Sequence, residues 1–285
     1  MPTPIPTTRH ASTNNESEGF GDADYLAFQR HIQAKVGIRL ADYKPEQMRR
    51  RIGTIADRAG FKSFQEYFTA MDKNQELLNG FLDKMTINVS ELLRNPPRFD
   101  DLFLKVFPSV LRDRGADKPI AIWSAGCSYG AEAYSLALLL HDQHPRLQYS
   151  ILGTDIDREV LEKAKSGHFT VADMNNVSEL RRQKYFSAAA NGTYDVKNNL
   201  RDKVTFSKHD LLADPYPSDT YDLIVCRNVV IYFTDAAKER IYRNFYAALK
   251  PGGVLFVGGT ERLPDHRAIG FDLVMPFFYR KPLSA

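Results

Sequence analysis

The sequence predicts an α/β fold: a doubly wound, mostly parallel sheet with an inserted small antiparallel β subdomain, preceded by a small all-α N-terminal domain. Three observations support this prediction. Residues 22–85 show helical periodicity almost throughout. From Ile120 onward, continuous apolar strands alternate with helices, as in a parallel sheet covered on both faces. A polar stretch at about 168–203 interrupts the alternation and is expected to form the inserted subdomain.

Four segments are expected along the chain. Residues 1–21 are rich in Pro, Thr, Ser and Asn without an apolar signal core, which predicts a disordered lead-in. The helical domain is expected at 22–85, a linker with a helix at 86–118, and the sheet domain at 119–285.

Proline and capping residues predict where several helices begin or end. Pro45 suits the first turn of a helix that runs to Ala59. Ser63 followed by Glu66 predicts a capping box. The pair Pro96-Pro97 is expected to break any helix in the linker.

The sheet domain shows a strand or helix signal in nearly every segment. The expected strands are 120–127, 149–156, 204–210, 222–232, 254–261 and 271–279, and the expected helices are 131–140, 159–165 and 235–250. Pro251-Gly252-Gly253 is expected to be a helix-to-strand turn. In the insert, a short helix capped by Ser178 and a hairpin at Asn191-Gly192 are expected.

Composition excludes several classes of protein. The chain has 285 residues, 43% of them apolar and 26% charged, which is ordinary for a globular protein, and no apolar run approaches a membrane span. Cys127 and Cys226 are the only cysteines and are expected to be buried, inert thiols in a reducing cytosol. A net charge of +3 does not indicate a binder of nucleic acid.

One region is locally basic. Between Tyr43 and Lys62, only Glu46 and Asp57 oppose the cations Lys44, Arg49, Arg50, Arg51, Arg58 and Lys62. Such a face favours an acidic partner surface or nucleic acid, and a solvated helix face is the alternative.

The segment from Ile120 to Asp155 is typical of a nucleotide-type cofactor site. Gly126 and Gly130 would let the backbone approach a ligand at the N-terminus of the helix that follows. Asp155 closes the next strand, where a carboxylate can accept both hydroxyls of a ribose. The glycines do not complete a G-x-G-x-x-G motif, so an ordinary packing turn is the alternative.

Further strand ends are expected at the same edge, because open α/β sheets bind ligands beyond the carboxyl ends of their strands. Asp210 suits the adenine amine, with Leu211 packing against the ring, although a helix cap is the alternative for Asp210. Glu132 would lie near a cationic ligand group, or would merely complement the helix N-terminus. Arg227 and Asn228 end another strand. An acidic pocket without a second phosphate anchor favours a cationic cofactor, and S-adenosylmethionine is one.

The sequence does not contain the motifs of several other kinds of active site. The chain shows no Ser-His-Asp order, no His/Cys metal spacing and no G-K-[ST] phosphate loop. No metal cofactor is therefore expected.

Seven segments of the chain form a recognisable set: LADYKPEQMRRRI, TINVSELLR (taken as helical), WSAGCSYGAEAYSLA, GTDID, KHDLL, CRNVVIYF and LKPGGVLFVGGTE. Through these segments, from about Asp22 to Lys281, the chain resembles the chemotaxis receptor methyltransferases, the CheR family. It implies a SAM-methyltransferase-type fold that transfers a methyl group from S-adenosyl-L-methionine to glutamyl carboxylates of chemoreceptors, leaving S-adenosyl-L-homocysteine. Glutamate has an ordinary pKa of about 4.3, so this reaction needs no general base at neutral pH.

The resemblance also implies a role for individual residues. Arg94 and Tyr232 would flank the reacting methyl group. With Gly126 of the glycine turn, the cofactor contacts would be Asn88, Ser90, Arg94, Glu132, Asp155, Asp210, Leu211, Arg227 and Asn228. The cytoplasmic methylation helices of chemoreceptors would dock on Arg49, Arg50, Arg51 and Arg58.

The chain departs from the family pattern at several positions. Leu92-Leu93 stand where aromatics are usual, Ala131 and Ala133 flank Glu132 where Glu and Pro are common, Asp210 stands for a common Asn, and Gly259-Thr260 replaces a frequent His-Ser. The insert hairpin, SAAANGTYDVKNN, looks shorter than in members that grip a receptor's C-terminal pentapeptide, so tight pentapeptide binding is not expected. The protein is expected to be cytoplasmic, not inserted in a membrane, and not bound to nucleic acid.

Two alternative functions stay open. One is a CheR-like methyltransferase that acts outside chemotaxis, on another protein or on a small acid. The other is a non-catalytic adaptor that binds S-adenosylmethionine or its product. Asn88, Arg94, Asp155 and Tyr232 argue against the adaptor.

Overall fold

The computed structural model describes residues 20–85, 90–115, 118–189, 192–259, 261–263 and 265–283. Contacts divide the chain into two compact units, which are described separately: Met1–Ala41 with Pro45–Phe81, and Asp42–Lys44 with Leu82–Ala285. Residues 1–19 of the expected lead-in, Asn88, and Asn191 of the expected hairpin lie outside the described residues.

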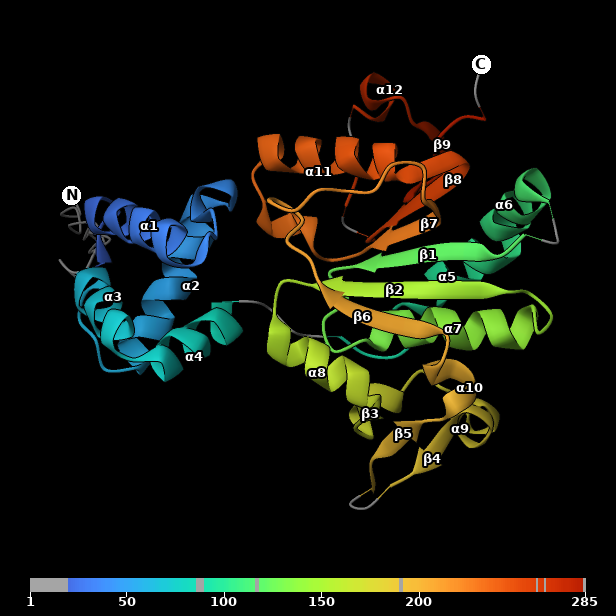
Figure 1. Cartoon of the computed structure of the whole chain (residues 1–285), viewed down its shortest axis with the longest axis horizontal. Coiled ribbons are helices and arrows are strands. Elements are labelled where there is room, and N and C mark those ends of the chain that lie inside the picture. Colours follow the sequence, from blue (N-terminus) through green and yellow to red (C-terminus); the bar gives the residue numbers. More distant parts are fainter. Residues whose placement is uncertain are drawn as a thin grey trace, which may run out of the picture. The chain divides into compact units, whose positions relative to one another are not determined.

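The N-terminal part of the chain is helical, as predicted (Figure 1). Its helices are α1 (Asp22–Val36), α2 (Pro45–Arg58), α3 (Phe64–Lys73) and α4 (Gln75–Met85), with a 3-10 turn at Leu40–Asp42. Phe28 of α1 packs against the rings of Phe64 and Phe81, at centroid distances of 5.3 and 5.6 Å. The apolar stripe of α1 therefore forms the core of the first unit.

The expected capping box is only half formed. The Ser63 hydroxyl accepts a hydrogen bond from the Glu66 N–H at 3.0 Å, which is the first half of the motif. The Glu66 carboxylate accepts from the Lys62 N–H at 2.9 Å, one residue earlier than the motif requires.

The second unit contains a seven-stranded sheet in the order β6-β2-β1-β7-β8-β10-β9. Its strands are β1 (Ile120–Ala125), β2 (Tyr149–Asp155), β6 (Val204–Lys208), β7 (Tyr221–Cys226), β8 (Leu249–Val257), β9 (Asp272–Met275) and β10 (Phe278–Arg280). β1, β2, β6, β7 and β8 pair in parallel, whereas β10 is antiparallel to both of its neighbours. The predicted mostly parallel sheet is confirmed, and its strand order reverses between β1 and β7.

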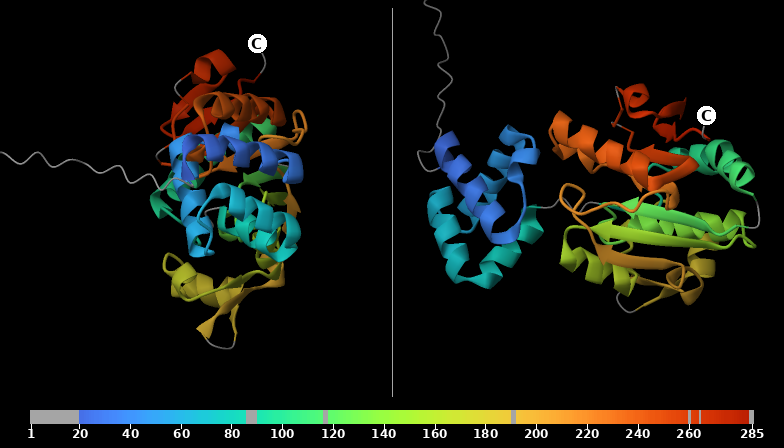
Figure 2. Two further views of the ribbon diagram at one scale, coloured as in Figure 1. Left: turned by 90° about the vertical axis from the view of Figure 1, so that its left-hand side faces the viewer. Right: turned by 45° about the horizontal axis from the view of Figure 1, so that its top comes forward.

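Helices cover both faces of this sheet (Figures 1 and 2). They are α5 (Pro96–Asp100), a π-helical turn (Asp101–Val106), α6 (Phe107–Arg114), α7 (Ala131–Gln143), α8 (Arg158–Ser166), α11 (Asp235–Ala248) and α12 (His266–Ile269). Ile122 of β1 packs in the cluster formed with α7, whereas its neighbour Trp123 packs in the cluster formed with α11. Alternate side chains of one strand thus fill two cores, as a doubly wound fold requires.

The inserted subdomain is a three-stranded antiparallel sheet, as predicted (Figure 1). Its elements are β3 (His168–Phe169), a 3-10 turn (Ala172–Met174), α9 (Glu179–Tyr185), β4 (Phe186–Ala188), β5 (Tyr194–Val196) and α10 (Asn198–Arg201), and β5 is the central strand. α9 follows Ser178 as expected, but the Ser178 side chain makes no capping hydrogen bond.

The structure corrects three local expectations. Residues 90–95 of TINVSELLRN form turns rather than a helix. Pro96-Pro97 begins helix α5, because proline suits the first helical positions, where its missing N–H would have no partner. Residues 251–253, expected to form a turn, lie inside β8. The expected final strand is split into β9 and β10 around Phe277, which has a φ of 77°.

No helix in the described ranges combines the length and the apolar character needed to cross a bilayer. Both cysteines are buried as predicted, and burial raises the pKa of each thiol well above its usual range.

Candidate functional site

The glycine turn lies at the point where the strand order reverses, between β1 and helix α7. The N–H groups of Gly126 and Cys127 both donate to the Thr154 carbonyl at 2.8 Å, which fixes the turn against β2. Gly126 has a φ of 75°, and a Cβ there would lie 2.4 Å from a methyl group of Val229. Only glycine therefore lets the turn touch the loop that follows β7.

Asp155, at the end of β2, is oriented by backbone donors. One carboxylate oxygen accepts from the Ser128 N–H at 2.8 Å, and the other accepts from the Asp157 N–H at 3.1 Å. Burial raises the pKa of Asp155, although these hydrogen bonds act in the opposite direction. The carboxylate is thus held at the sheet edge by the turn that precedes α7.

Glu132, Arg227 and Arg94 form one linked cluster. The Ser124 hydroxyl donates to Glu132 at 2.8 Å, and Arg227 Nη1 lies 3.7 Å from the other Glu132 oxygen. Arg227 Nη2 donates to the Arg94 carbonyl at 2.9 Å. Burial raises the pKa of Glu132, and the charges of Arg227 and Arg94 oppose that rise. The segment that carries Arg94 is thereby joined to the end of β7 and the start of α7.

The conformation around Arg94 is unusual. Leu93 and Asn95, on either side of it, have φ values of 56° and 60°, a region that residues with side chains rarely adopt. Ser90, at the start of the described segment, accepts a hydrogen bond at its carbonyl from the Tyr129 hydroxyl. Two of the predicted site residues thus lie on a short, tightly held segment.

Glu261 is a site residue that the sequence analysis missed. Its carboxylate accepts from the N–H groups of Gly258, Asn228 and Val229, at 2.6, 2.8 and 3.1 Å. These bonds shape the loop after β7, in which Asn228 has a φ of 60°. An acidic residue shortly after an apolar strand, as in Asp155, is the signal that could have identified Glu261.

Tyr43 is a second missed residue, and it fixes the backbone of Tyr232. Tyr43 pairs with Phe233 in an antiparallel bridge, the Lys44 N–H donates to the Tyr232 carbonyl at 2.9 Å, and the Thr234 N–H donates to the Asp42 carbonyl at 2.8 Å. Burial raises the pKa of Tyr43, and nearby carboxylates, among them Asp210 and Asp155, raise it further.

Asp210 forms a local turn, and because the described residues directly after it form no helix, the helix cap considered as its alternative is not formed. One of its carboxylate oxygens accepts from the Leu212 N–H at 2.8 Å, and its own N–H donates to Asp214 at 2.8 Å. Leu211 is 8% exposed and packs in the cluster that contains Trp123. The proposed adenine contacts of this pair stay predictions.

The four arginines predicted to bind receptors lie on α2 of the first unit. Arg50 and Arg58 are exposed, whereas Arg49 and Arg51 are half-buried. Arg49 pairs with Asp22 of α1 at 2.9 Å, so part of its charge is neutralised within this unit.

In the second unit, five of the predicted cofactor residues follow or end strands β1, β2, β6 and β7 at their carboxyl ends: Gly126, Asp155, Asp210, Arg227 and Asn228. The structure links Arg94 to Glu132 and Arg227, and links Tyr43 electrostatically to Asp155 and Asp210. Within the described residues, no group of three or more His, Cys, Asp or Glu could hold a metal ion.

Two family models match the chain. The model described as "CheR methyltransferase, all-alpha domain" matches residues 23–86, and "CheR methyltransferase, SAM binding domain" matches residues 88–274. The chain belongs to the CheR methyltransferase family. The second of these domains is thus one that binds S-adenosylmethionine, and the family is one of methyltransferases of chemotaxis.

Several relatives carry the name chemotaxis protein methyltransferase. The protein from Listeria monocytogenes is 39% identical over 261 residues, which span 91% of this chain and 98% of the relative. A protein from Pseudomonas aeruginosa is 32% identical, with 86% and 93% covered, and one from Vibrio cholerae is 31% identical, with 85% and 86% covered.

Solved methyltransferases align with the chain at low TM-score and low sequence identity. An S-adenosylmethionine-dependent methyltransferase from Mesorhizobium loti aligns with a TM-score of 0.30 and 18% identity, covering 53% of this chain and 51% of that one. Phosphoethanolamine N-methyltransferase 2 from Haemonchus contortus aligns with a TM-score of 0.31 and 15% identity, covering 54% and 27%.

The buried carboxylates predict how cofactor binding depends on pH. The pKa values of Glu132 and Asp155 are raised, and a cationic cofactor favours their ionised forms. Affinity for S-adenosylmethionine is therefore expected to fall as the pH is lowered from 7, starting above the ordinary carboxyl range of about 4. The folding stability of the protein without cofactor depends on pH in the opposite direction. A raised folded-state pKa stabilises the fold at low pH, and this stabilisation is lost as the pH rises from the unfolded-state pKa through the folded-state pKa.

Calorimetric titration between about pH 4.5 and 8 measures this effect. Glu132→Gln is expected to weaken binding at pH 7 and to flatten the profile. Glu239→Gln, which removes an exposed carboxylate on α11, serves as the control and is expected to keep the wild-type profile. An affinity that stays level down to about pH 4.5 would contradict the prediction.

Proposed function

We propose that the protein methylates glutamyl side chains of methyl-accepting chemoreceptors in chemotaxis adaptation, which makes it a protein-glutamate O-methyltransferase. The observation that carries the proposal is the cluster in which Arg94, Glu132 and Arg227 are joined at the cofactor end of the sheet. The family and the names of its relatives supply the setting of chemotaxis. The proposal includes a cytoplasmic location, where the methylation helices of receptors lie.

The residues at the sheet edge fit S-adenosylmethionine. Asp155 would accept the ribose hydroxyls, and Asp210 with Leu211 would bind the adenine. Glu132 would face the cationic amino-acid end of the cofactor. Gly126, Asn88, Ser90, Arg227 and Asn228 would complete the pocket. When bound, S-adenosylmethionine supplies an electrophilic methyl group on a positively charged sulfur.

Arg94 and Tyr232 would act on the substrate. A substrate glutamate has an ordinary pKa of about 4.3 and arrives ionised at neutral pH, so the site needs no base. Arg94 would hold this carboxylate by charge-assisted hydrogen bonds. Tyr232, whose backbone is fixed by the bonds to residues 42–44, would border the same position.

The reaction balances without proton transfer. A carboxylate oxygen of the substrate forms a bond to the methyl carbon as the carbon–sulfur bond breaks. The substrate would lose its negative charge on becoming a methyl ester, and S-adenosyl-L-homocysteine, a neutral thioether, would be the other product. The protein's contribution is therefore alignment of the two reactants, which accounts for a large part of the rate of such reactions.

Arginines on α2 would provide the receptor-docking surface. Arg51 and Arg58 are seven residues apart and so lie on one side of the helix, two turns from each other. Glutamate-rich methylation helices would be attracted to Arg49, Arg50, Arg51 and Arg58. Nucleic acid is not proposed as a partner.

The alkali stability of the product tests the proposed function. The protein is incubated with methyl-labelled S-adenosylmethionine and receptor-containing membranes, and the labelled product is then treated with base. Release of labelled methanol identifies a carboxyl ester on the receptor. Base-stable label would indicate a different acceptor atom, label on other proteins would support a different target, and no label would favour the adaptor function.

Arg94→Ala is expected to lower kcat by about 100-fold or more, because the substrate carboxylate loses its partner. Affinity for S-adenosylmethionine, measured by calorimetry, is expected to be partly retained. Arg98→Ala removes a neighbouring arginine that pairs with Asp101 and is the matched control, with near-normal turnover. Unchanged turnover of Arg94→Ala would refute the assignment.

Receptor methylation is expected to fall steeply with added salt at saturating cofactor, because docking on α2 is electrostatic. The double variant Arg50→Ala, Arg58→Ala should raise the KM for receptor and reduce its salt dependence. The control is Lys105→Ala, Arg112→Ala, which removes two cations whose side chains are 63% and 75% exposed in the second unit. Equal salt dependence in both double variants would count against this docking surface.

Tight binding of a receptor's C-terminal pentapeptide is not expected. β4 and β5 are joined by only residues 189–193, and the Ala189 N–H already donates to the Thr193 carbonyl at 2.8 Å. The proposed reason is that so short a hairpin leaves little loop for gripping a peptide. Calorimetry that detects micromolar binding of such a pentapeptide would overturn this expectation.

A further inference from the structure

The segment Ser90–Arg94 is held by four parts of the second unit. The Ser90 carbonyl accepts a hydrogen bond from the Tyr129 hydroxyl, and the Arg94 carbonyl accepts one from Arg227 Nη2 at 2.9 Å. The Leu92 N–H donates to the Asp173 carbonyl at 3.1 Å. The Leu93 N–H donates to the Ser135 hydroxyl oxygen at 2.7 Å. The partners belong to the glycine turn, the inserted subdomain, helix α7 and the end of β7. No single element therefore sets the conformation of the segment.

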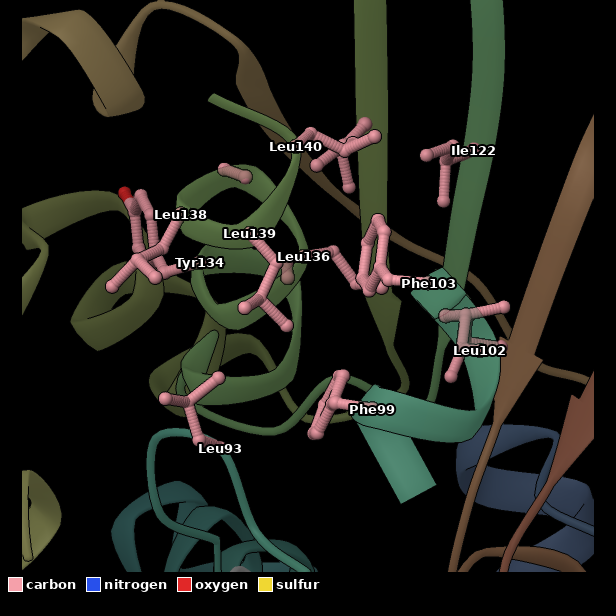
Figure 3. Packing of buried hydrophobic residues seen from close by; sticks show 14 of the residues in the cluster. Leu93, Phe99, Leu102, Phe103, Ile122, Tyr134, Leu136, Leu138, Leu139 and Leu140 are labelled. Atoms are coloured by element: carbon pink, nitrogen blue, oxygen red, sulfur yellow. The ribbon is translucent and has the colours of Figure 1, made fainter. Parts of the chain in front are cut away.

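These bonds select a conformation that the segment would not favour by itself. Leu93 and Asn95 have positive φ values of 56° and 60°, which are unfavourable for residues with a side chain. The Leu93 side chain is 3% exposed and packs toward α7 near Phe99 (Figure 3). Loss of an anchor would let the backbone relax toward negative φ and would move Arg94, which lies between the two residues.

Asp173 connects the insert to this segment. Its carbonyl accepts from Leu92, and one carboxylate oxygen lies 2.9 Å from the Tyr129 hydroxyl. The other carboxylate oxygen accepts from the N–H and the hydroxyl of Thr170, at 2.8 and 2.7 Å. Asp173 thus joins the start of the insert, the glycine turn and the Arg94 segment.

The Tyr129 hydroxyl has one proton and two acceptors, the Ser90 carbonyl and the Asp173 carboxylate. If the hydroxyl is removed, these two oxygens face the same space with no donor between them, and they repel each other. The phenyl ring would keep its contact with Phe169, at 6.2 Å between centroids. Tyr129→Phe therefore removes the connection and preserves the packing.

We propose that Tyr129 and Asp173 are positioning residues through which the inserted subdomain holds the Arg94 segment in its working conformation. This inference rests on the proposed role of Arg94. It gives the insert a function in catalysis besides any docking role: the subdomain completes the backbone support of the active segment.

Tyr129→Phe and Asp173→Asn are tested against Tyr149→Phe. The control removes a hydrogen bond of the same kind, from a tyrosine hydroxyl to the Ala137 carbonyl at 3.0 Å, at a buried position on the first residue of β2. Each test variant is expected to lower kcat by about tenfold or more, with a smaller change in the KM for receptor, because misplacement by about 1 Å can have effects of this size. The double variant should lose less than the product of the two single effects, since both break one connection. Tyr149→Phe should keep near-normal kcat.

Hydrogen exchange provides a readout that does not depend on activity. The amides of Leu92 and Leu93 donate to Asp173 and Ser135, so both are expected to exchange faster in Tyr129→Phe than in wild type or Tyr149→Phe. If the wild type forms no base-labile ester, the proposed function fails, and the exchange rates still decide whether the pair anchors the segment. Unchanged exchange, or unchanged kcat in an active preparation, would overturn the proposal.

Discussion

The guanidinium of Arg227 is enclosed by protein, with 2% of its side chain exposed, between the rings of Phe99 and Phe256 at 5.1 and 5.0 Å. An unpaired charge in such a place costs several kcal/mol, so the ion needs partners at fixed positions. Glu132 supplies one and the Arg94 carbonyl supplies another. Because both partners carry proposed functions, neutralising this buried cation also brings the cofactor end of the site and the Arg94 segment together.

Carboxylates near the strand ends likewise hold the backbone in place at positions where ligand binding is proposed. Asp155 orients the glycine turn, Asp210 forms a turn after β6, and Glu261 gathers three backbone N–H groups around the loop after β7. For Asp210, the helix cap considered from the sequence is not formed, because a turn and not a helix follows it. This turn does not exclude ligand binding, because a carboxylate has about four acceptor sites and backbone bonds occupy only some of them.

Much of the fold was predictable because its signals are local. Helical stripes, apolar strands and the Gly126 turn each occupy one short stretch of sequence, and the rule for strand ends then groups Asp155, Asp210 and Arg227. The supports of the site are not local. The Arg227–Arg94 bond joins residues 133 positions apart, and the bridge of Tyr43 with Phe233 pairs two segments that lie far apart in the sequence. The positive φ of Leu93 depends on those distant partners, which is why the segment around it was wrongly expected to be helical.

The contacts between distant residues also matter for the proposed reaction. A transfer that needs no base depends mainly on alignment, and alignment depends on how firmly the aligning groups are held before the reactants arrive. Asp155 and Glu132 are each fixed by hydrogen bonds to the protein, so little side-chain freedom remains to be lost when a ligand binds. Arg94 has a long and flexible side chain, and it is the backbone beneath it that is fixed, by Arg227 and through Leu92 by Asp173. By the same reasoning, the inserted subdomain would contribute to alignment, since it restrains the backbone next to Arg94.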